Sequence, residues 1–576
     1  MKRSVGGHAN KPGDRTPKLR SESPRPSPAD DGHGVAATRA GVLQHGSRGR
    51  RSLASSYTSP AREPGDLDVA ARRVVRTRQL HEGTTPYDAA ASDEESDEGM
   101  VPKKSAKTWV TPVESMEGRP EAEGKSAARN ASPTQDGTDA LTFLQRIGQR
   151  AKDRPEEQLT NLLSHIKVPL LREAYLRVRR NAATGVDGVT WQEYGEHLDA
   201  RLLDLQDRVH RGNYHPQPVR RVHIPKGDGR TRPLGIPVLE DKIVQQAARM
   251  VLEPIYEAQF VGFSYGFRPG RSPHDALDAL AEAIARKVSW VLDADIRSFF
   301  DTIDHGWMQK FIEHRIGDRR MVRLLMKWLH AGVMEDGELR EVTEGTPQGG
   351  IISPLLANIY LHYTLDLWVL QWRKKHAHGQ VYFVRYADDF VTGFQFEQDA
   401  RAMHSALTER LAQFGLQLHP DKTRVIQFGR FAREDRERRG LRKPETFDFL
   451  GFTHIAGADQ HGRFQLRRRS SRKKRRAKHA LLKDEIRRRR HWPVTEQHRW
   501  LCAVLRGHDR YYGVPTNERV LRQFHRAVAD CWHRSLQRRS QRGRWSRRQE
   551  RAFKDRYPLP PPKIHHPWPE RRFANR

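Results

Sequence analysis

Hydrophobic and polar positions divide the chain into three parts. Residues 1–138 contain few apolar periodic positions and are rich in Ser, Pro, Gly, Arg and Ala, with an acidic block, SDEESDEG, at 92–99. A segment of this composition cannot bury enough apolar surface to offset its chain entropy, so we predict a disordered basic extension. From about residue 139 the apolar positions become periodic, and after about residue 460 the chain becomes strongly basic.

The middle part alternates between helical and strand patterns without a regular β-α-β period. Helical spacing is found in ALTFLQRIGQRAK, VPLLREAYLRVRRNA, KIVQQAARMVLEPIY, RMVRLLMKWLHAGV and DARAMHSALTERLAQFG. Strand patterns are found in VRRVHIPKGDGRTRPLGIPV, with a KGDGR turn, in SWVLDADIRSFF and in VYFVRYADDFVTGF, whose two short strands meet near residues 387–389. This irregular alternation predicts an α+β domain.

Three helical segments carry a distinct apolar stripe. The stripe residues are Ile243, Ala247, Met250 and Val251 in the first, Ala400, Met403, Leu407 and Leu411 in the second, and Val520, Leu521, Phe524, Val528, Trp532 and Leu536 in the third. Gly415 suits the left-handed position that ends the second helix. The third helix has arginines mainly off its stripe, so we expect a small helical domain with one apolar and one basic face.

Composition changes the picture by pointing to a polyanionic partner. The 576 residues include 103 Lys and Arg against 71 Asp and Glu, a formal net charge of +32, and this favours nucleic acid. The two cysteines, Cys502 and Cys531, form no CxxC pair and cannot build a disulfide framework, which fits a reducing cytosol. The start of the chain lacks the apolar core of a secretory signal, and no apolar run is long enough for a membrane span.

The candidate chemistry centres on three aspartates. Asp388 and Asp389 stand side by side at an expected hairpin tip, where two anions repel each other unless a divalent cation neutralises them. Asp295, on one face of an expected strand, is the best third acid. Three carboxylates on two strands suit a two-metal nucleotidyl transfer. A solvated DD turn, or an ion pair between Asp295 and Arg385, is the alternative from these residues alone.

The order of several motifs resembles that of reverse transcriptases. The motifs are IPKGDGRTRPLGIP, LDADIRSFFDTIDH, GTPQGGIISPLLANIYL, RYADDF, GLQLHPDKTRVIQF and FDFLGFTH. Over about residues 140–570 the chain is similar to the reverse transcriptase/maturase proteins encoded by bacterial group II introns. The segment RGHDRYYGVP also resembles the maturase, or thumb, domain of that family.

This resemblance implies roles for individual residues. Asp295, Asp388 and Asp389 match the catalytic triad that holds two Mg²⁺ ions, and the main-chain carbonyl of Ile296 is implied as a further metal ligand. Phe300 matches the aromatic residue that excludes a ribose 2′-hydroxyl and so selects dNTPs. Asp301 and Asp304 lie in the same motif but are interpreted as turn or cap residues.

Other matched residues would contact the nucleotide or the primer. Lys226 and Arg232 match residues that bind the incoming triphosphate, for which Arg offers a fork of donors and Lys a point charge. Gln348 matches the residue that lines the nucleotide pocket, beside glycines that allow close backbone approach. Lys422 matches a lysine that protonates pyrophosphate, and residues 447–454 match the primer grip. A basic hairpin, a Gly-rich turn and a surface lysine are the structural alternatives.

The resemblance implies a right-hand polymerase fold in the α+β class. We expect the disordered extension over 1–138, fingers and palm over 139–457, a helical thumb or maturase domain over 458–560 and a Pro-rich basic tail over 561–576. The implied function is RNA-directed DNA synthesis from dNTPs on an RNA template with a DNA primer. Binding of the encoding group II intron RNA, in the bacterial cytoplasm or nucleoid, would assist splicing and retrohoming.

Two features depart from the fullest pattern of this family. Many relatives carry a C-terminal HNH endonuclease with paired cysteines, which we do not expect here, since no CxxC occurs. The N-terminal extension is either translated intron sequence or a flexible arm. A reverse transcriptase recruited to phage defence or another task, and a catalytically silent RNA-binding splicing factor, are the rival functions.

Overall fold

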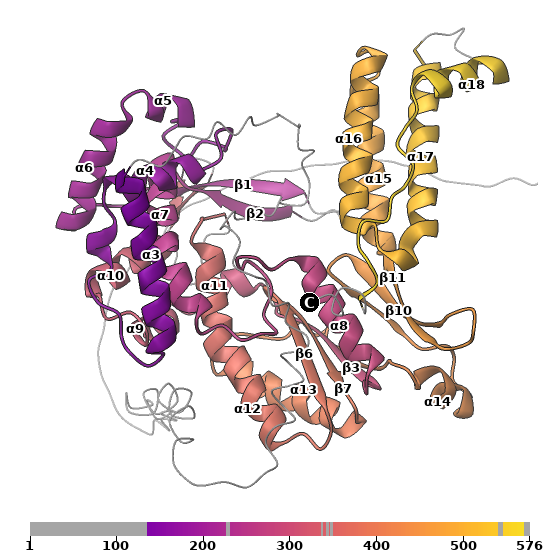
Figure 1. The fold of residues 1–576 in the computed structure, drawn as a ribbon, viewed down its shortest axis with the longest axis horizontal. Helices are drawn as coiled ribbons and strands as arrows, with labels where there is room; N and C mark the ends of the chain where they lie inside the picture. Colours follow the sequence, from indigo (N-terminus) through magenta and orange to yellow (C-terminus); the bar gives the residue numbers. More distant parts are fainter. Residues whose placement is uncertain are drawn as a thin grey trace, which may run out of the picture. The chain divides into compact units, whose positions relative to one another are not determined.

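The structure is a computed structural model. The residues that it describes are 135–225, 231–335, 338–340, 345, 349–539 and 545–569. The predicted disordered extension therefore lies almost entirely outside the described residues, and helix α3 (Gln135–Asp153) begins shortly before the expected end of that extension. Beyond α3, helices and strands alternate irregularly, so the chain is a mixed α/β protein as its pattern predicts (Figure 1).

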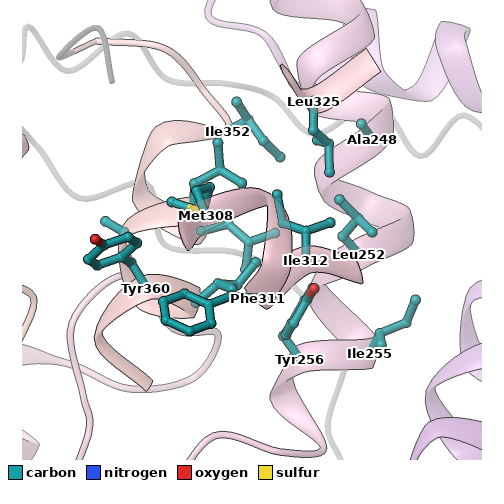
Figure 2. Close-up of a cluster of buried hydrophobic side chains, with 14 of the residues drawn as sticks. Ala248, Leu252, Ile255, Tyr256, Met308, Phe311, Ile312, Leu325, Ile352 and Tyr360 are labelled. Carbon is teal, nitrogen blue, oxygen red and sulfur yellow. The ribbon is translucent and has the colours of Figure 1, made fainter. Parts of the chain in front are cut away.

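The main apolar core is built around a long buried helix, α7 (Leu239–Glu257). Its predicted stripe is confirmed, because all four stripe residues are buried in that core. The other helices around it are α3, α4 (Val168–Arg177), α5 (Trp191–Gly195), α6 (Leu198–Arg211), α9 (His305–Glu313), α10 (Arg319–Leu329), α11 (Ser353–Leu361) and α12 (Leu367–Lys375). Figure 2 shows side chains of α7 and α9 meeting in this core, together with Leu325, Ile352 and Tyr360.

A four-stranded sheet runs beside this core in the order β6-β7-β3-β8. Its strands are β3 (Trp290–Asp295), β6 (Val381–Tyr386), β7 (Asp389–Phe394) and β8 (Arg424–Gln427), and each adjacent pair is antiparallel. Helix α13 (Glu397–Ala412) buries its predicted stripe in the main core, with Leu292 and Phe390 from one face of the sheet. Helix α8 (Pro273–Ala285) packs in a second apolar cluster, with Val291 and Val391 from the opposite face. Both faces of the sheet are therefore covered.

Two smaller sheets flank this arrangement. One has the order β2-β1-β4-β5, with β1 (Val219–Pro225), β2 (Thr231–Ile236), β4 (Val333–Glu335) and β5 (Glu338–Arg340). The predicted KGDGR turn between β1 and β2 lies outside the described residues. The other sheet has the order β11-β10-β9, with β9 (Thr446–Phe449), β10 (Phe452–Ala458) and β11 (Phe464–Ser470).

The C-terminal region is helical. Its helices are α15 (Arg472–Arg488), α16 (Val494–Tyr512), α17 (Glu518–Gln537) and α18 (Arg547–Arg556), and the short helix α14 (Ala432–Arg438) precedes β9. Figure 1 shows α15, α16 and α17 side by side, and they share a third apolar core. The predicted stripe of α17 is buried, which confirms that helix and its face. The expected boundary between residues 457 and 458 falls at the end of β10, within a sheet that continues into β11.

Several local predictions from turn and cap chemistry are also confirmed. Asp304 is the N-cap of α9 and accepts a 2.7 Å hydrogen bond from the Trp307 amide. Gly415 has φ +71°, the left-handed conformation expected after α13. Among the described residues, no helix is both long and apolar enough to span a bilayer.

Candidate active site

Strand register brings two of the three predicted acids face to face. In the antiparallel pair β3–β7, Asp295 stands directly opposite Asp389, and in the hairpin β6–β7, Tyr386 stands opposite Asp389. The two-residue turn between these strands contains Asp388, so the predicted hairpin tip is confirmed. Like charges directly across two strands are destabilising, and the fold keeps them there. A register that retains this repulsion favours a functional role for the acids.

A buried arginine fixes the turn that carries the acids. The Arg385 guanidinium donates to the Ala387 carbonyl at 3.0 Å, to Asn358 Oδ1 at 3.0 Å and to Asp366 Oδ1 at 2.7 Å. Both Arg385 and Asp366 have fully buried side chains. Ala387 itself has φ +56°, and Gly266 lies so close that a Cβ there would be 2.3 Å from the Ala387 nitrogen. The turn is therefore held by packing and by a buried ion pair.

Cations already lie beside two of the strand acids. Lys422, from the loop before β8, forms an ion pair with Asp295, and Arg424 lies 3.6 Å from Asp293. The alternative ion pair between Asp295 and Arg385 is not formed, since Arg385 binds Asp366 instead. Lys422 is thus placed at the predicted site, although its proton-transfer role stays a prediction.

The electrostatics of the site disfavour an isolated negative charge on Asp389. Desolvation by the surrounding protein, followed by repulsion from Asp388 and Asp295, raises the pKa of Asp389 to about 7. Solvent nevertheless reaches Asp389, which is an exposed residue. Water weakens the desolvation of an exposed carboxylate, so repulsion from Asp388 and Asp295 is the stronger cause of the raised pKa of Asp389. Asp293 is less exposed, and burial raises its pKa to about 6.

The donor set fits divalent cations. Three carboxylates supply hard oxygen ligands of the kind that Mg²⁺ prefers, and the Lys422 ammonium marks a place where a cation is stabilised by Asp295. Within the described ranges, no three Asp, Glu, His or Cys side chains are gathered into a ready-made metal-binding group. Ile296, the implied carbonyl ligand, directly follows Asp295 and has a buried side chain.

Phe300 lies in the turn that follows β3. This turn includes the short helix η2 (Phe299–Asp301), and the partly buried Phe300 ring packs against the main core. Gly345, from the predicted nucleotide-pocket motif, is held against the turn, because its amide donates to the Ile303 carbonyl at 2.8 Å. His305 Nε2 donates to the Gly345 carbonyl at 2.6 Å. Sequence reasoning missed His305, although it ends the motif LDADIRSFFDTIDH.

The glycines of the GTPQGG motif allow close contact with the chain's own backbone. Gly345 has φ +85°, and a Cβ there would lie 2.8 Å from the Phe300 carbonyl oxygen. Gly349 has φ +120°, and a Cβ there would lie 2.3 Å from the carbonyl oxygen of Gly235 in β2. Two predicted site residues, Gln348 and Lys226, lie outside the described residues. Arg232 is described only through its backbone, which pairs with Ile224 in the β1–β2 hairpin.

The predicted primer-grip segment is a β-hairpin. Strands β9 and β10 are joined by a tight turn in which Leu450 has φ +47° and Gly451 has φ +80°. The Ser471 amide, at the start of α15, donates to the Gly451 carbonyl at 2.9 Å. Lys474, in the first turn of α15, is near enough to Asp389 for its positive charge to lower the pKa of that carboxyl, although the effects that raise this pKa are larger. The turn therefore joins the acid site to the C-terminal helical region.

The same hairpin buries a histidine, from which we predict a pH-dependent stability. Burial, reinforced by the charge of Arg468, lowers the pKa of His454 to about 3. In the unfolded chain this histidine binds a proton below about pH 6.5, whereas in the folded chain it stays neutral until the pH approaches 3. The contribution of neutral His454 to the unfolding free energy is therefore fully present above about pH 6.5 and decreases as the pH is lowered toward 3. At pH 5 the expected loss of unfolding free energy is about 2 kcal/mol.

Urea unfolding at pH 7.5 and pH 5.0 measures this loss. His454→Leu is expected to lose about 2 kcal/mol less than the wild type between these pH values. His461, an exposed residue in the loop between β10 and β11, gives the matched control His461→Leu, which should keep the wild-type dependence. Equal losses in the wild type and His454→Leu would show that another group controls the acid response.

Comparison with known proteins agrees with this geometry. The family described as reverse transcriptase (RNA-dependent DNA polymerase) matches residues 224–454, which include both acid strands, β9 and the start of β10. Protein YkfC of Escherichia coli is 38% identical over 277 residues, covering 42% of this chain and 71% of YkfC. The chain belongs to the reverse transcriptase family.

A second relative is encoded by a group II intron. The group II intron-encoded protein LtrA of Lactococcus lactis is 38% identical over 237 residues. That match covers 41% of this chain but 39% of LtrA, so the chain spans well under half of this relative. The 91 kDa protein in the cob intron of Schizosaccharomyces pombe is 37% identical over 229 residues, covering 38% of this chain and 28% of that protein. The chain is therefore a reverse transcriptase related to group II intron proteins.

Proposed function

We propose that the chain is a right-hand RNA-directed DNA polymerase that copies RNA from dNTPs. In this assignment the β1–β2 hairpin belongs to the fingers, the sheet β6-β7-β3-β8 is the palm, and α15, α16 and α17 form the thumb. The observation that carries the proposal is the register of β3 and β7, which sets Asp295 opposite Asp389 with Asp388 in the adjoining turn.

The three aspartates would hold two Mg²⁺ ions, with the Ile296 carbonyl as a further ligand. Bound there, the ions supply activation of the primer 3′-hydroxyl and neutralise charge on the triphosphate. Lys422, which forms an ion pair with Asp295, would give a proton to the departing pyrophosphate. The Phe300 ring would occupy the space of a ribose 2′-hydroxyl.

Residues at the fingers and in the GTPQGG motif would complete the nucleotide site. Lys226 and Arg232 would bind the triphosphate, and Gln348 would line the pocket. The contact between His305 and Gly345 ties the described part of that motif to the turn of Phe300. The turn after β3 would then position both Phe300, which excludes the 2′-hydroxyl, and the GTPQGG motif, which lines the nucleotide pocket.

Primer extension tests the polymerase assignment. The purified full chain should extend an oligo(dT) primer on a poly(rA) template with dTTP and Mg²⁺, and chelation of the metal should abolish extension. A folded chain that extends no primer under these conditions would instead favour the rival of a silent RNA-binding splicing factor.

We further propose that the chain binds its encoding group II intron RNA in the bacterial cytoplasm and assists splicing and retrohoming. The similarity to LtrA and the net charge of +32 support this partner. Phosphate contacts from the basic faces of α15 and α17 should make such binding strongly salt-dependent. A-form RNA offers mainly backbone and 2′-hydroxyl groups, so recognition would depend on shape.

Crosslinking in the native cell tests this second role. After crosslinking and purification at high salt, the bound RNA should be enriched in the transcript that carries this gene, centred on structured intron segments. Enrichment of an unrelated RNA would leave the polymerase in place and would assign the chain to reverse transcriptases recruited to another task.

A further inference from the structure

An exposed tryptophan stands at the end of the C-terminal helical region. Trp492 lies in the short connection between α15 and α16 and is 46% exposed. A single exposed apolar side chain is common on protein surfaces, so what distinguishes Trp492 is its fixed backbone and its cationic surroundings. Three arginines lie beside it. Arg489 stacks on its ring, Arg490 is two positions before it in the chain, and the Arg539 guanidinium donates to its backbone carbonyl.

The turn that carries Trp492 is fixed by hydrogen bonds to its backbone. The Gln497 amide donates to the Trp492 carbonyl at 2.9 Å and to the Arg490 carbonyl at 3.2 Å. The Arg539 guanidinium donates to the same two carbonyls, each at 2.6 Å. Gln497 is itself buried and accepts a 2.9 Å hydrogen bond from the indole of the fully buried Trp532. The position of Trp492 is therefore set by the core of the helical region.

One face of the Trp492 ring is already used. The guanidinium carbon of Arg489 lies 4.5 Å from the Trp492 ring centroid and 4.6 Å from the Trp500 centroid, so the arginine is stacked between two indoles. Arg489 is held in turn by Glu485, which accepts a 2.7 Å hydrogen bond from its Nε. This stack orients the Trp492 ring and leaves exposed aromatic surface among cations.

We propose that Trp492 is a stacking platform for an unpaired nucleobase of a nucleic acid bound to the helical region. An aromatic face beside several arginines matches a ligand that alternates flat bases with phosphates, and base–aromatic stacking is a recurring means of binding single strands. This inference deepens the proposed RNA binding and rests on it. A base of RNA and a base of single-stranded DNA offer the same chemistry, and the experiment separates them.

Binding of the full chain to three probes tests the platform. The probes are an RNA hairpin with a bulged purine, a fully paired RNA hairpin of equal length, and a single-stranded DNA. Trp492→Ala should bind the bulged RNA about tenfold more weakly than the wild type, because stacking one base contributes about 1–3 kcal/mol. Affinity for the fully paired RNA should stay unchanged, and Trp492→Phe should recover most of the loss.

The salt dependence separates stacking from charge. Trp492→Ala removes no phosphate contact, so the slope of log affinity against log salt should equal that of the wild type. Leu481→Ala, which removes a different exposed apolar side chain, one on α15, is the matched control and should bind all probes normally. A loss that extends to single-stranded DNA would show that either nucleic acid supplies the base, whereas a loss confined to RNA would assign it to RNA.

Two outcomes would overturn the platform. One is unchanged affinity of Trp492→Ala for the bulged RNA, and the other is an equal loss for the bulged and the paired RNA. If the intron transcript is still selected in cells in either case, the platform alone is wrong and the proposed RNA partner stands. If Trp492→Ala weakens base binding while the intron transcript is not enriched, the platform stands and the proposed partner is wrong.

Discussion

Asp388→Ala is expected to abolish primer extension on an RNA template while leaving RNA binding largely intact. The substitution removes one of the three carboxylates of the proposed metal site, the one in the turn between β6 and β7. Metal-assisted charge stabilisation contributes several kcal/mol to such a transfer, and about 1.4 kcal/mol corresponds to a factor of ten in rate. We therefore expect a loss of about 1000-fold or more in the rate of dTTP incorporation.

Two measurements accompany this variant. RNA affinity should change little, because the basic surface of the helical region is untouched. Asp421→Ala gives a matched control, since Asp421 is an exposed aspartate beside Lys422 that belongs to neither acid strand. It should extend primers at the wild-type rate. Full extension by Asp388→Ala would show that the active site has been assigned wrongly.

Arg385→Ala is expected to destabilise the fold by about 3–5 kcal/mol, because it leaves the carboxylate of Asp366 buried without its partner. Both side chains are fully buried, and desolvation already raises the pKa of Asp366. The substitution also removes the hydrogen bond to the Ala387 carbonyl, so the turn bearing Asp388 loses its support. Primer extension should therefore fall even at temperatures where the variant is folded.

A double-mutant cycle separates the ion pair from the rest. Arg385→Ala with Asp366→Ala should be less destabilised than the sum of the single variants, because the uncompensated charge is gone. Denaturant unfolding of all four proteins gives the coupling free energy. The matched control is Arg401→Ala, which breaks an exposed pair with Glu397 on α13 and should cost less than about 1 kcal/mol. Additive losses at Arg385 and Asp366 would contradict the proposed coupling.

Local sequence rules predicted much of the scaffold. The stripes of α7, α13 and α17, the left-handed Gly415 and the cap at Asp304 all follow from the chain within one or two helical turns. The hairpin at Asp388 was also predictable, since two β-branched and aromatic runs flank a short polar break. These features depend on residues close in sequence, so no knowledge of distant contacts was needed.

Contacts between distant segments were not predictable in this way. The partner of Arg385 could have been Asp295, but in the structure Arg385 pairs with Asp366, nineteen positions away along the chain. His305 donates a hydrogen bond to the carbonyl of Gly345, which is forty positions away along the chain. Asn358, a polar residue inside a mostly apolar helix, was a weak sign of a buried polar contact. The sequence did not indicate that its partner is Arg385.

The sequence by itself determined the family, because the resemblance to reverse transcriptases depends only on residue types and on the order and spacing of the motifs. It also determined the helices and hairpins whose apolar period is read directly from the chain. Only the tertiary structure decided which cation neutralises which acid and how the turn of Asp388 is held. It also decided that Trp492 is left exposed on a rigid turn. The physical reason is that burial and ion pairing depend on three-dimensional neighbours, which a one-dimensional pattern does not specify.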